Sequence, residues 1–168
     1  KRTRTTVLKI IQLPTVASTG PLSLEQALTA RRSSRSFSPA PLDFIQLGQL
    51  AFAAQGITDT QNGYRTAPSA GAIYPMTLFL ANNKGVFEYL PNDHTLKQIT
   101  QTDIRKKLAI AALNQQPVTD APCNFIIAGQ VKKLARKYSA TFNYPLVVIV
   151  PPKRFISSNP ACSRRNGR

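Results

Sequence analysis

The sequence predicts an α+β domain. Two segments near the N-terminus have the spacing and capping residues of helices, and two later segments joined by a tight turn are typical of an antiparallel hairpin. Helices mixed with antiparallel strands favour this class over a doubly wound parallel sheet. With 168 residues, 42% of them hydrophobic, the chain has the length of one domain and can bury a core.

The two predicted helices begin at capping residues. Ser23 and Gln26 form a capping-box pattern, which predicts a helix that continues to Arg31. Asp43 can cap a second helix that ends before Gly56. Four apolar residues recur on one face of this second helix: Leu47, Leu50, Ala51 and Ala54.

The later part of the chain alternates strands and helices. Residues 77–81 and 86–90 predict two strands, because an Asn-Asn-Lys-Gly turn between them suits a hairpin. We expect Asp103 to open a third helix that runs through Leu113. Residues 123–128 predict a short apolar strand, and residues 131–138 a basic helix.

The charge of the chain is strongly positive and unevenly spread. Twenty-two Lys and Arg residues against seven Asp and Glu give a net charge of +15, and residues 121–168 contain no carboxylate side chain. Such an excess can bind phosphate backbones, so a basic nucleic-acid-binding module is the alternative function. Against this alternative, the aromatic residues are not interleaved with the basic clusters, and no nucleic-acid motif is present.

The cysteines and the apolar stretches argue against a metal-binding, a secreted or a membrane-spanning protein. Cys123 and Cys162 are not in a CxxC spacing, and His94 is the single histidine, so we expect no metal site. Two reduced thiols indicate a cytoplasmic protein. No apolar run approaches the ~18–20 residues that a membrane span needs. Residues 1–20 form a basic leader whose apolar stretch is too interrupted for a signal peptide.

Two stretches carry candidate chemistry. The first, Arg31-Arg32-Ser33-Ser34-Arg35, offers three guanidinium groups and two hydroxyls, which can neutralise a phosphate dianion. A solvated basic helix end is the alternative interpretation. The second, Arg65 to Pro75, contains small residues between two prolines, and these allow a flat ligand to approach the backbone. An ordinary turn entering the next strand is its alternative.

Together, in this order, the two stretches resemble the nitroreductase-like flavoenzymes, specifically the SagB-type dehydrogenase branch. The resemblance covers about residues 13–138, and its most specific part is the Pro-Ser-Ala-Gly-Ala-x-Tyr-Pro string over residues 68–75. The family resemblance implies a nitroreductase-like fold that binds flavin mononucleotide (FMN) at the interface of a homodimer. It also implies ping-pong hydride transfer, with NAD(P)H as a candidate electron donor and a small molecule or modified peptide as substrate. Azoline oxidation is one activity of that branch.

The resemblance also assigns site residues. Arg31, Ser33 and Arg35 would clasp the flavin phosphate and ribityl chain, with Arg32 acting through its backbone. Pro68, Ser69, Ala70 and Gly71 would lie against the flavin ring from the partner protomer, and Gln115 or Gln116 would line the substrate side. No catalytic side chain is assigned, because the flavin itself supplies the reactive atom. His94 follows a turn, which favours an exposed, structural role over acid–base catalysis.

We divide the chain into the leader 1–20, the N-terminal part of the family domain over 21–138, and an atypical basic tail over 139–168. The family's Glu-x-Gly-His-x-x-Gln-Asn helix is absent after Tyr138. A frameshift near residues 139–147 would explain this loss together with the missing acids. A genuine basic tail and a divergent fold are the alternatives. We therefore expect an incomplete domain in which the apolar faces of the second helix and the strands lack partners. Reduced stability, weak or absent FMN binding and an inactive fragment are the expected consequences.

Overall fold

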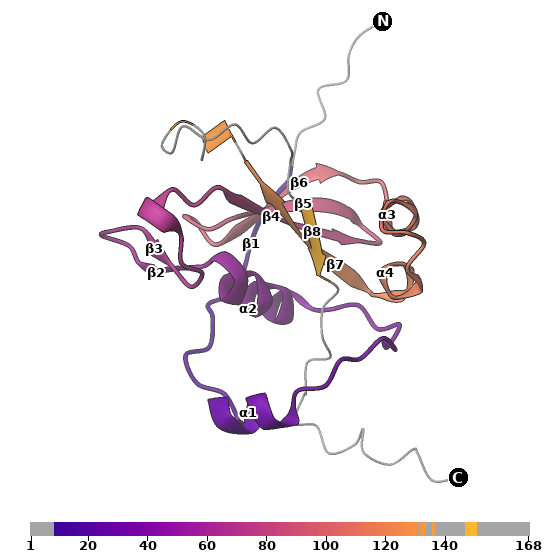
Figure 1. The fold of residues 1–168 in the computed structure, drawn as a ribbon, viewed down its shortest axis with the longest axis horizontal. Helices are drawn as coiled ribbons and strands as arrows, with labels where there is room; N and C mark the ends of the chain where they lie inside the picture. Colours follow the sequence, from indigo (N-terminus) through magenta and orange to yellow (C-terminus); the bar gives the residue numbers. More distant parts are fainter. Residues whose placement is uncertain (1–8, 131, 134–135, 137–146, 151–168) are drawn as a thin grey trace, which may run out of the picture.

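A six-stranded antiparallel sheet forms the centre of the molecule (Figure 1). The computed structural model describes residues 9–130, 132–133, 136 and 147–150. Every neighbouring pair of strands runs antiparallel. The order across the sheet is β1 (Ile10–Gln12), β6 (Thr95–Thr100), β5 (Gly85–Leu90), β4 (Met76–Asn82), β7 (Cys123–Gly129) and β8 (Val147–Val150).

The two N-terminal helices form as expected, because their capping residues are local. Helix α1 (Leu24–Ala30) begins at the Ser23 capping box, and α2 (Phe44–Gln55) begins at a second capping box formed by Asp43 and Gln46. Gly56 is the C-terminal cap of α2. The hairpin of β4 and β5 is confirmed by the pairing of Asn82 with Gly85 across its turn.

The third helix differs from expectation. Helix α3 spans Arg105–Ala111, with Ile104 rather than Asp103 at its N-cap. The Asp103 carboxylate instead accepts hydrogen bonds from the backbone N–H and the guanidinium of Arg105. The helix also ends early, since Leu113 and Asn114 adopt left-handed conformations with φ of 60° and 58°. A short helix α4 (Gln116–Asp120) follows.

The core lies between α2 and one face of the sheet. Leu47 and Ala51 of α2 pack against Leu78 and Leu80 of β4, with Leu50 and Ala54 partly buried beside them. On the opposite face, Ile126 belongs to a second buried cluster, against which the partly buried Ile104 and Leu108 pack. Our expectation that these apolar faces lack partners is therefore wrong, because α2 and the sheet bury each other.

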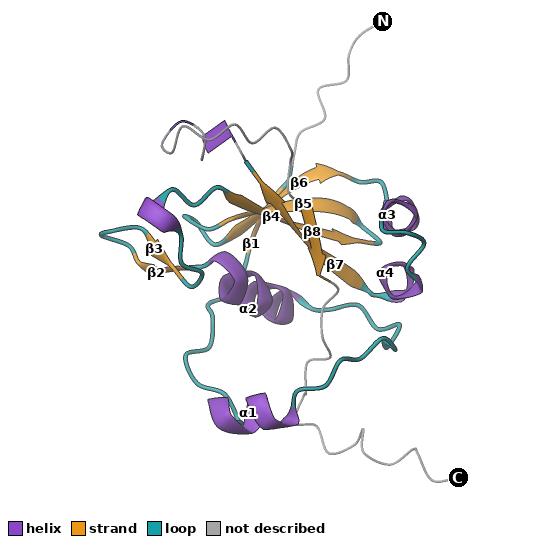
Figure 2. Cartoon of the chain, in the orientation of Figure 1, coloured by secondary structure: helices purple, strands orange, loops and turns teal. Residues whose placement is uncertain are grey.

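Helix α1 stands apart from this body, between two long loops (Figure 2). It buries none of its residues, and the side chains of Leu24 and Leu28 are 70% and 63% exposed. Figure 1 shows three other features that position the site: α3 and α4 at one end of the sheet, and the 3-10 turn η1 (Ala70–Ala72) beyond the other. Near η1 lies a small hairpin of β2 (Ile57–Asp59) and β3 (Tyr64–Arg65).

The two edge strands come from segments that we set apart by sequence. Strand β1 lies within the leader, and β8 lies within the tail, where it pairs with β7. Neither strand was predicted. The expected basic helix over 131–138 lies mostly outside the described residues, as do the proposed frameshift region before residue 147 and the tail after residue 150.

Candidate functional site

The first candidate segment follows α1 directly. Arg31 caps the helix in an extended conformation, and the chain stays without regular structure through Arg35. Arg31, Ser33 and Arg35 are exposed, and their side chains make no hydrogen bond with another described residue. These two guanidinium groups are therefore available to an anion.

Arg32 differs from its neighbours. Its Nη1 donates to the carbonyl oxygens of Thr29 (3.0 Å) and Arg31 (2.9 Å), so the side chain folds back onto the C-terminal end of α1. A guanidinium suits that position, because helix C-terminal carbonyls lack intrahelical donors. One nitrogen of the Arg32 guanidinium is thus bonded to the end of the helix.

The second candidate segment is a strained turn that leads into β4. Gly71, Ala72 and Tyr74 have φ of 60°, 52° and 45°. Left-handed φ is uncommon for residues with a Cβ and persists where surrounding contacts enforce it. Here Ser69 supplies two such contacts. Its carbonyl accepts a hydrogen bond from the Ala72 N–H, and its Oγ accepts one from the Tyr74 N–H, each at 2.9 Å.

This turn presents small residues to solvent. Pro68, Ala70 and Gly71 are exposed, and Ser69 is partly buried. A turn of small residues with an exposed backbone leaves room for a flat group to approach. The structure therefore retains the geometry on which the sequence prediction depends.

Arg65 lies beside this turn. Its Nη1 donates to Oε1 of Gln55 at 3.2 Å, and its Cζ lies 4.7 Å from the centroid of the Tyr74 ring. Thr66 fixes the hairpin to the end of α2, because its Oγ1 donates to the carbonyl of Phe52 at 3.0 Å. Arg65 starts the second stretch but has no role that the sequence alone assigns, because Gln55 and Tyr74 meet it only in the folded chain.

Gln115 is not near the strained turn. It is the exposed N-terminal cap of α4, and the neighbouring Gln116 bonds to Asp120 within the helix. Strand β4 separates the two regions, since Met76 follows the turn while Asn82 pairs with Cys123 beside α4. Seven residues of strand correspond to roughly 20 Å. One chain therefore does not bring Gln115, the Arg31–Arg35 segment and the turn together (Figure 1).

His94 has a structural position. Its Nε2 donates to the carbonyl of Pro14 (3.0 Å), since a carbonyl can only accept, and its Nδ1 then accepts from the Tyr89 hydroxyl (2.9 Å). Burial raises the pKa of Tyr89 to about 12, although the nearby Arg65 charge opposes this rise. His94 packs edge-on against the rings of Tyr89 and Phe52. Both ring nitrogens are occupied, which agrees with a structural role, but the side chain is partly buried rather than exposed as we expected.

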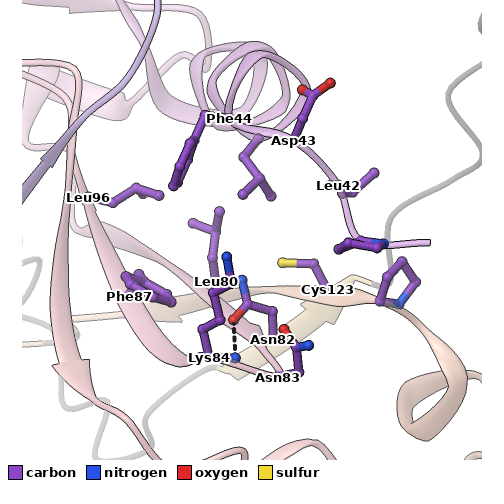
Figure 3. Close-up of a pocket in the computed structure, with 13 residues that line it drawn as sticks. Leu42, Asp43, Phe44, Leu80, Asn82, Asn83, Lys84, Phe87, Leu96 and Cys123 are labelled. Atoms are coloured by element: carbon purple, nitrogen blue, oxygen red, sulfur yellow. Dashed lines mark hydrogen bonds between the residues drawn. The ribbon is translucent and has the colours of Figure 1, made fainter. Parts of the chain in front are cut away.

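A cavity of about 280 Å³ lies between the start of α2 and the sheet (Figure 3). Leu80, Phe87 and Leu96 line it, and the thiol of Cys123 points into it. Burial raises the pKa of Cys123 to about 12, so this thiol stays protonated and is a poor nucleophile at neutral pH. The cavity lies near the β4–β5 turn, away from the strained turn.

In the described part of the chain, no group of three or more His, Cys, Asp or Glu residues could hold a metal ion. None of the helices described has the length and apolar content to cross a membrane.

Three comparisons relate the chain to known proteins. The model of the Nitroreductase family matches residues 28–148, ten residues beyond the point where we placed the end of the resemblance. A Methanocaldococcus jannaschii protein, provisionally named a nitroreductase, is 36% identical over 134 residues. That alignment covers 76% of this chain and 66% of the relative.

Solved structures share the fold. A crystal structure of a provisionally named nitroreductase from Ralstonia eutropha superposes with a TM-score of 0.67 at 26% identity, covering 77% of this chain and 60% of that one. A chain of the Escherichia coli microcin synthetase McbBCD complex superposes with a TM-score of 0.51 at 18% identity, covering 74% and 52%. The chain thus spans about two thirds or less of the length of these proteins. The matches confirm the nitroreductase-like α+β fold.

Proposed function

This chain belongs to the nitroreductase family, and from that premise we propose that it acts as an FMN-dependent oxidoreductase of the SagB type. The exposed turn at Pro68–Gly71 carries the proposal. It combines a left-handed Gly71 with small neighbours, and two hydrogen bonds to Ser69 fix the backbone of the turn. Such a surface fits the face of a flavin ring.

The residues after α1 fit the phosphate end of the same cofactor. A phosphate dianion needs guanidinium donors that are not already paired, and Arg31 and Arg35 meet this condition. Ser33 offers a hydroxyl to the same group, and we propose that Arg32 acts through its backbone, since Nη1 of its side chain binds the end of α1. When bound, FMN supplies the atom that accepts and returns hydride.

A homodimer would bring the separate parts of the site together. Helix α1 exposes Leu24 and Leu28, and the start of α2 exposes Phe44 and Ile45 by 45% and 65%. Exposed apolar side chains on helices favour burial in an interface. We propose that a second copy covers it, and that the Pro68–Gly71 turn of one protomer meets the Arg31–Arg35 segment of the other. Gln115 would then line the substrate side.

The finer assignments form part of the proposal. NAD(P)H is the proposed electron donor, and the substrate is a small molecule or a modified peptide whose azoline ring is oxidised. We propose a cytoplasmic location and residues 21–138 as the family domain. The alternative nucleic-acid-binding module gains no support from these comparisons, since the family matched over residues 28–148 accounts for most of the chain.

Flavin titration tests the proposal. The purified chain should quench the fluorescence of added FMN and shift its absorption spectrum. Gly71→Val should abolish these changes, because it adds a branched side chain at left-handed φ where the ring approaches. Gly20→Val is the matched control, since a Cβ there would meet nothing within 4 Å. If wild type and Gly71→Val bind FMN equally, the segment is only an ordinary turn that leads into β4.

A further inference from the structure

Arg65 is held in place by neutral groups alone. Gln55, which is only 7% exposed, accepts from its Nη1, and the Tyr74 ring lies under its guanidinium carbon. The backbone after Arg65 is fixed as well, because Thr66 bonds twice to the end of α2. The guanidinium therefore has a fixed position, as a binding group needs.

No Asp or Glu side chain forms an ion pair with Arg65 in the described part of the chain. All seven Asp and Glu side chains lie among the described residues, and the one ion pair there joins Arg105 to Asp103. Arg105 illustrates a satisfied arginine, since its Nε and Nη2 hold Asp103 and its Nη1 donates to the carbonyl of Ala121. Arg65 makes one side-chain hydrogen bond, and its buried Nε has no partner among the described residues.

The C-terminal end of α2 compensates the positive charge of Arg65 only in part. Gln55 is the last residue of α2, whose C-terminus carries about half a negative charge. No backbone carbonyl among the described residues accepts from the Arg65 side chain. A partly buried charge without an ionic partner is costly, and native structures normally supply a counter-ion.

We infer that Arg65 binds a carboxylate group of the substrate beside the Pro68–Gly71 turn. The anion reaches the guanidinium through its terminal nitrogens, because Nε is buried. Tyr74 joins the two parts of this site: its ring supports Arg65, and its N–H binds Ser69 within the turn. The inference rests on the proposed function, in which the turn faces the flavin ring, so the carboxylate would be held where hydride moves.

A nitrogen-15 NMR titration tests this inference without requiring flavin. Benzoate and benzamide share a flat ring and differ in charge, and both are added at constant ionic strength. Benzoate should shift the side-chain signals of Arg65 Nε and Gln55 saturably, at least about tenfold more tightly than benzamide. Equal affinity of the two compounds would overturn the inference, and this comparison needs no variant.

Variants locate the binding group. Arg65→Gln should reduce benzoate affinity at least about tenfold, judged on the Gln55 signal, and Arg65→Lys should restore part of it. Lys106→Gln removes an exposed cation from α3 and should leave the affinity unchanged. Unchanged binding by a folded Arg65→Gln variant would overturn the inference. FMN titration of the wild type is independent: its failure would refute the proposed function while benzoate binding still identified an anion site.

Discussion

The imidazole Nε2 of His94 donates a hydrogen bond to the carbonyl oxygen of Pro14, 80 residues earlier in the chain and 3.0 Å away. The same ring accepts from Tyr89, and the carbonyl of His94 accepts from the Leu13 N–H at 3.2 Å. His94 also limits the size of the side chain at position 48 of α2, because a Cβ at Gly48 would lie 3.3 Å from its Nε2. One side chain thus joins the segment after β1, the β5–β6 turn and α2.

Replacement of His94 by Phe should lower the free energy of unfolding by about 2 kcal/mol, since it leaves the Tyr89 hydroxyl and the Pro14 carbonyl without this partner. Urea denaturation measures the change. Asp93→Asn, at an exposed neighbouring position, should have little effect. Tyr89→Phe completes a double-mutant cycle, in which strict additivity would show that the two side chains are not coupled.

The stability of the chain should decline above pH 9. Burial raises the pKa of Cys123 from 9.0 to about 12 in the folded state, so the unfolded state loses the thiol proton first. The stabilisation from this group is complete below pH 9 and is lost as the pH rises toward 12. Between pH 8 and pH 10, wild type should lose about 1 kcal/mol more than Cys123→Ala. Parallel curves for the two proteins would contradict this prediction.

Gly85 should tolerate no side chain. Its φ is 123°, and a Cβ would collide with the carbonyl oxygen of Thr100 on the neighbouring strand. Gly85→Ala should therefore cost roughly 1–3 kcal/mol of stability in thermal or urea unfolding. Gly20→Ala is the control, because no atom lies near its added methyl group. A Gly85→Ala variant as stable as this control would show that the turn adjusts freely.

Arg35 should contribute to phosphate binding. Arg35→Ala should weaken FMN binding at least about tenfold, because charge-assisted hydrogen bonds to phosphate are lost. Riboflavin, which lacks the phosphate, should bind both proteins equally. Lys106→Ala controls for the loss of one positive charge elsewhere on the surface. If wild type binds riboflavin as tightly as FMN, the Arg31–Arg35 segment does not hold a phosphate.

Local signals in the sequence determined several elements of this fold. The helices at Ser23 and Asp43 were predictable because each cap and its partner are three residues apart and bond to each other. The β4–β5 hairpin was predictable because its turn sequence specifies the pairing of adjacent strands. The strings around residues 31–35 and 68–75 identified the family for the same reason, since each is contiguous.

Only the tertiary structure decided the rest, because those contacts join residues far apart in sequence. Strands β1 and β8 are three and four residues long, and they exist through pairing with β6 and β7 rather than through a periodic pattern of their own. Leu47 gained its partners on β4 in the same way, which overturned the expectation of an unpartnered face. Arg65 became a candidate binding residue only when folding placed Gln55 and Tyr74 against it without a carboxylate, because the cost of an unpaired charge depends on its surroundings.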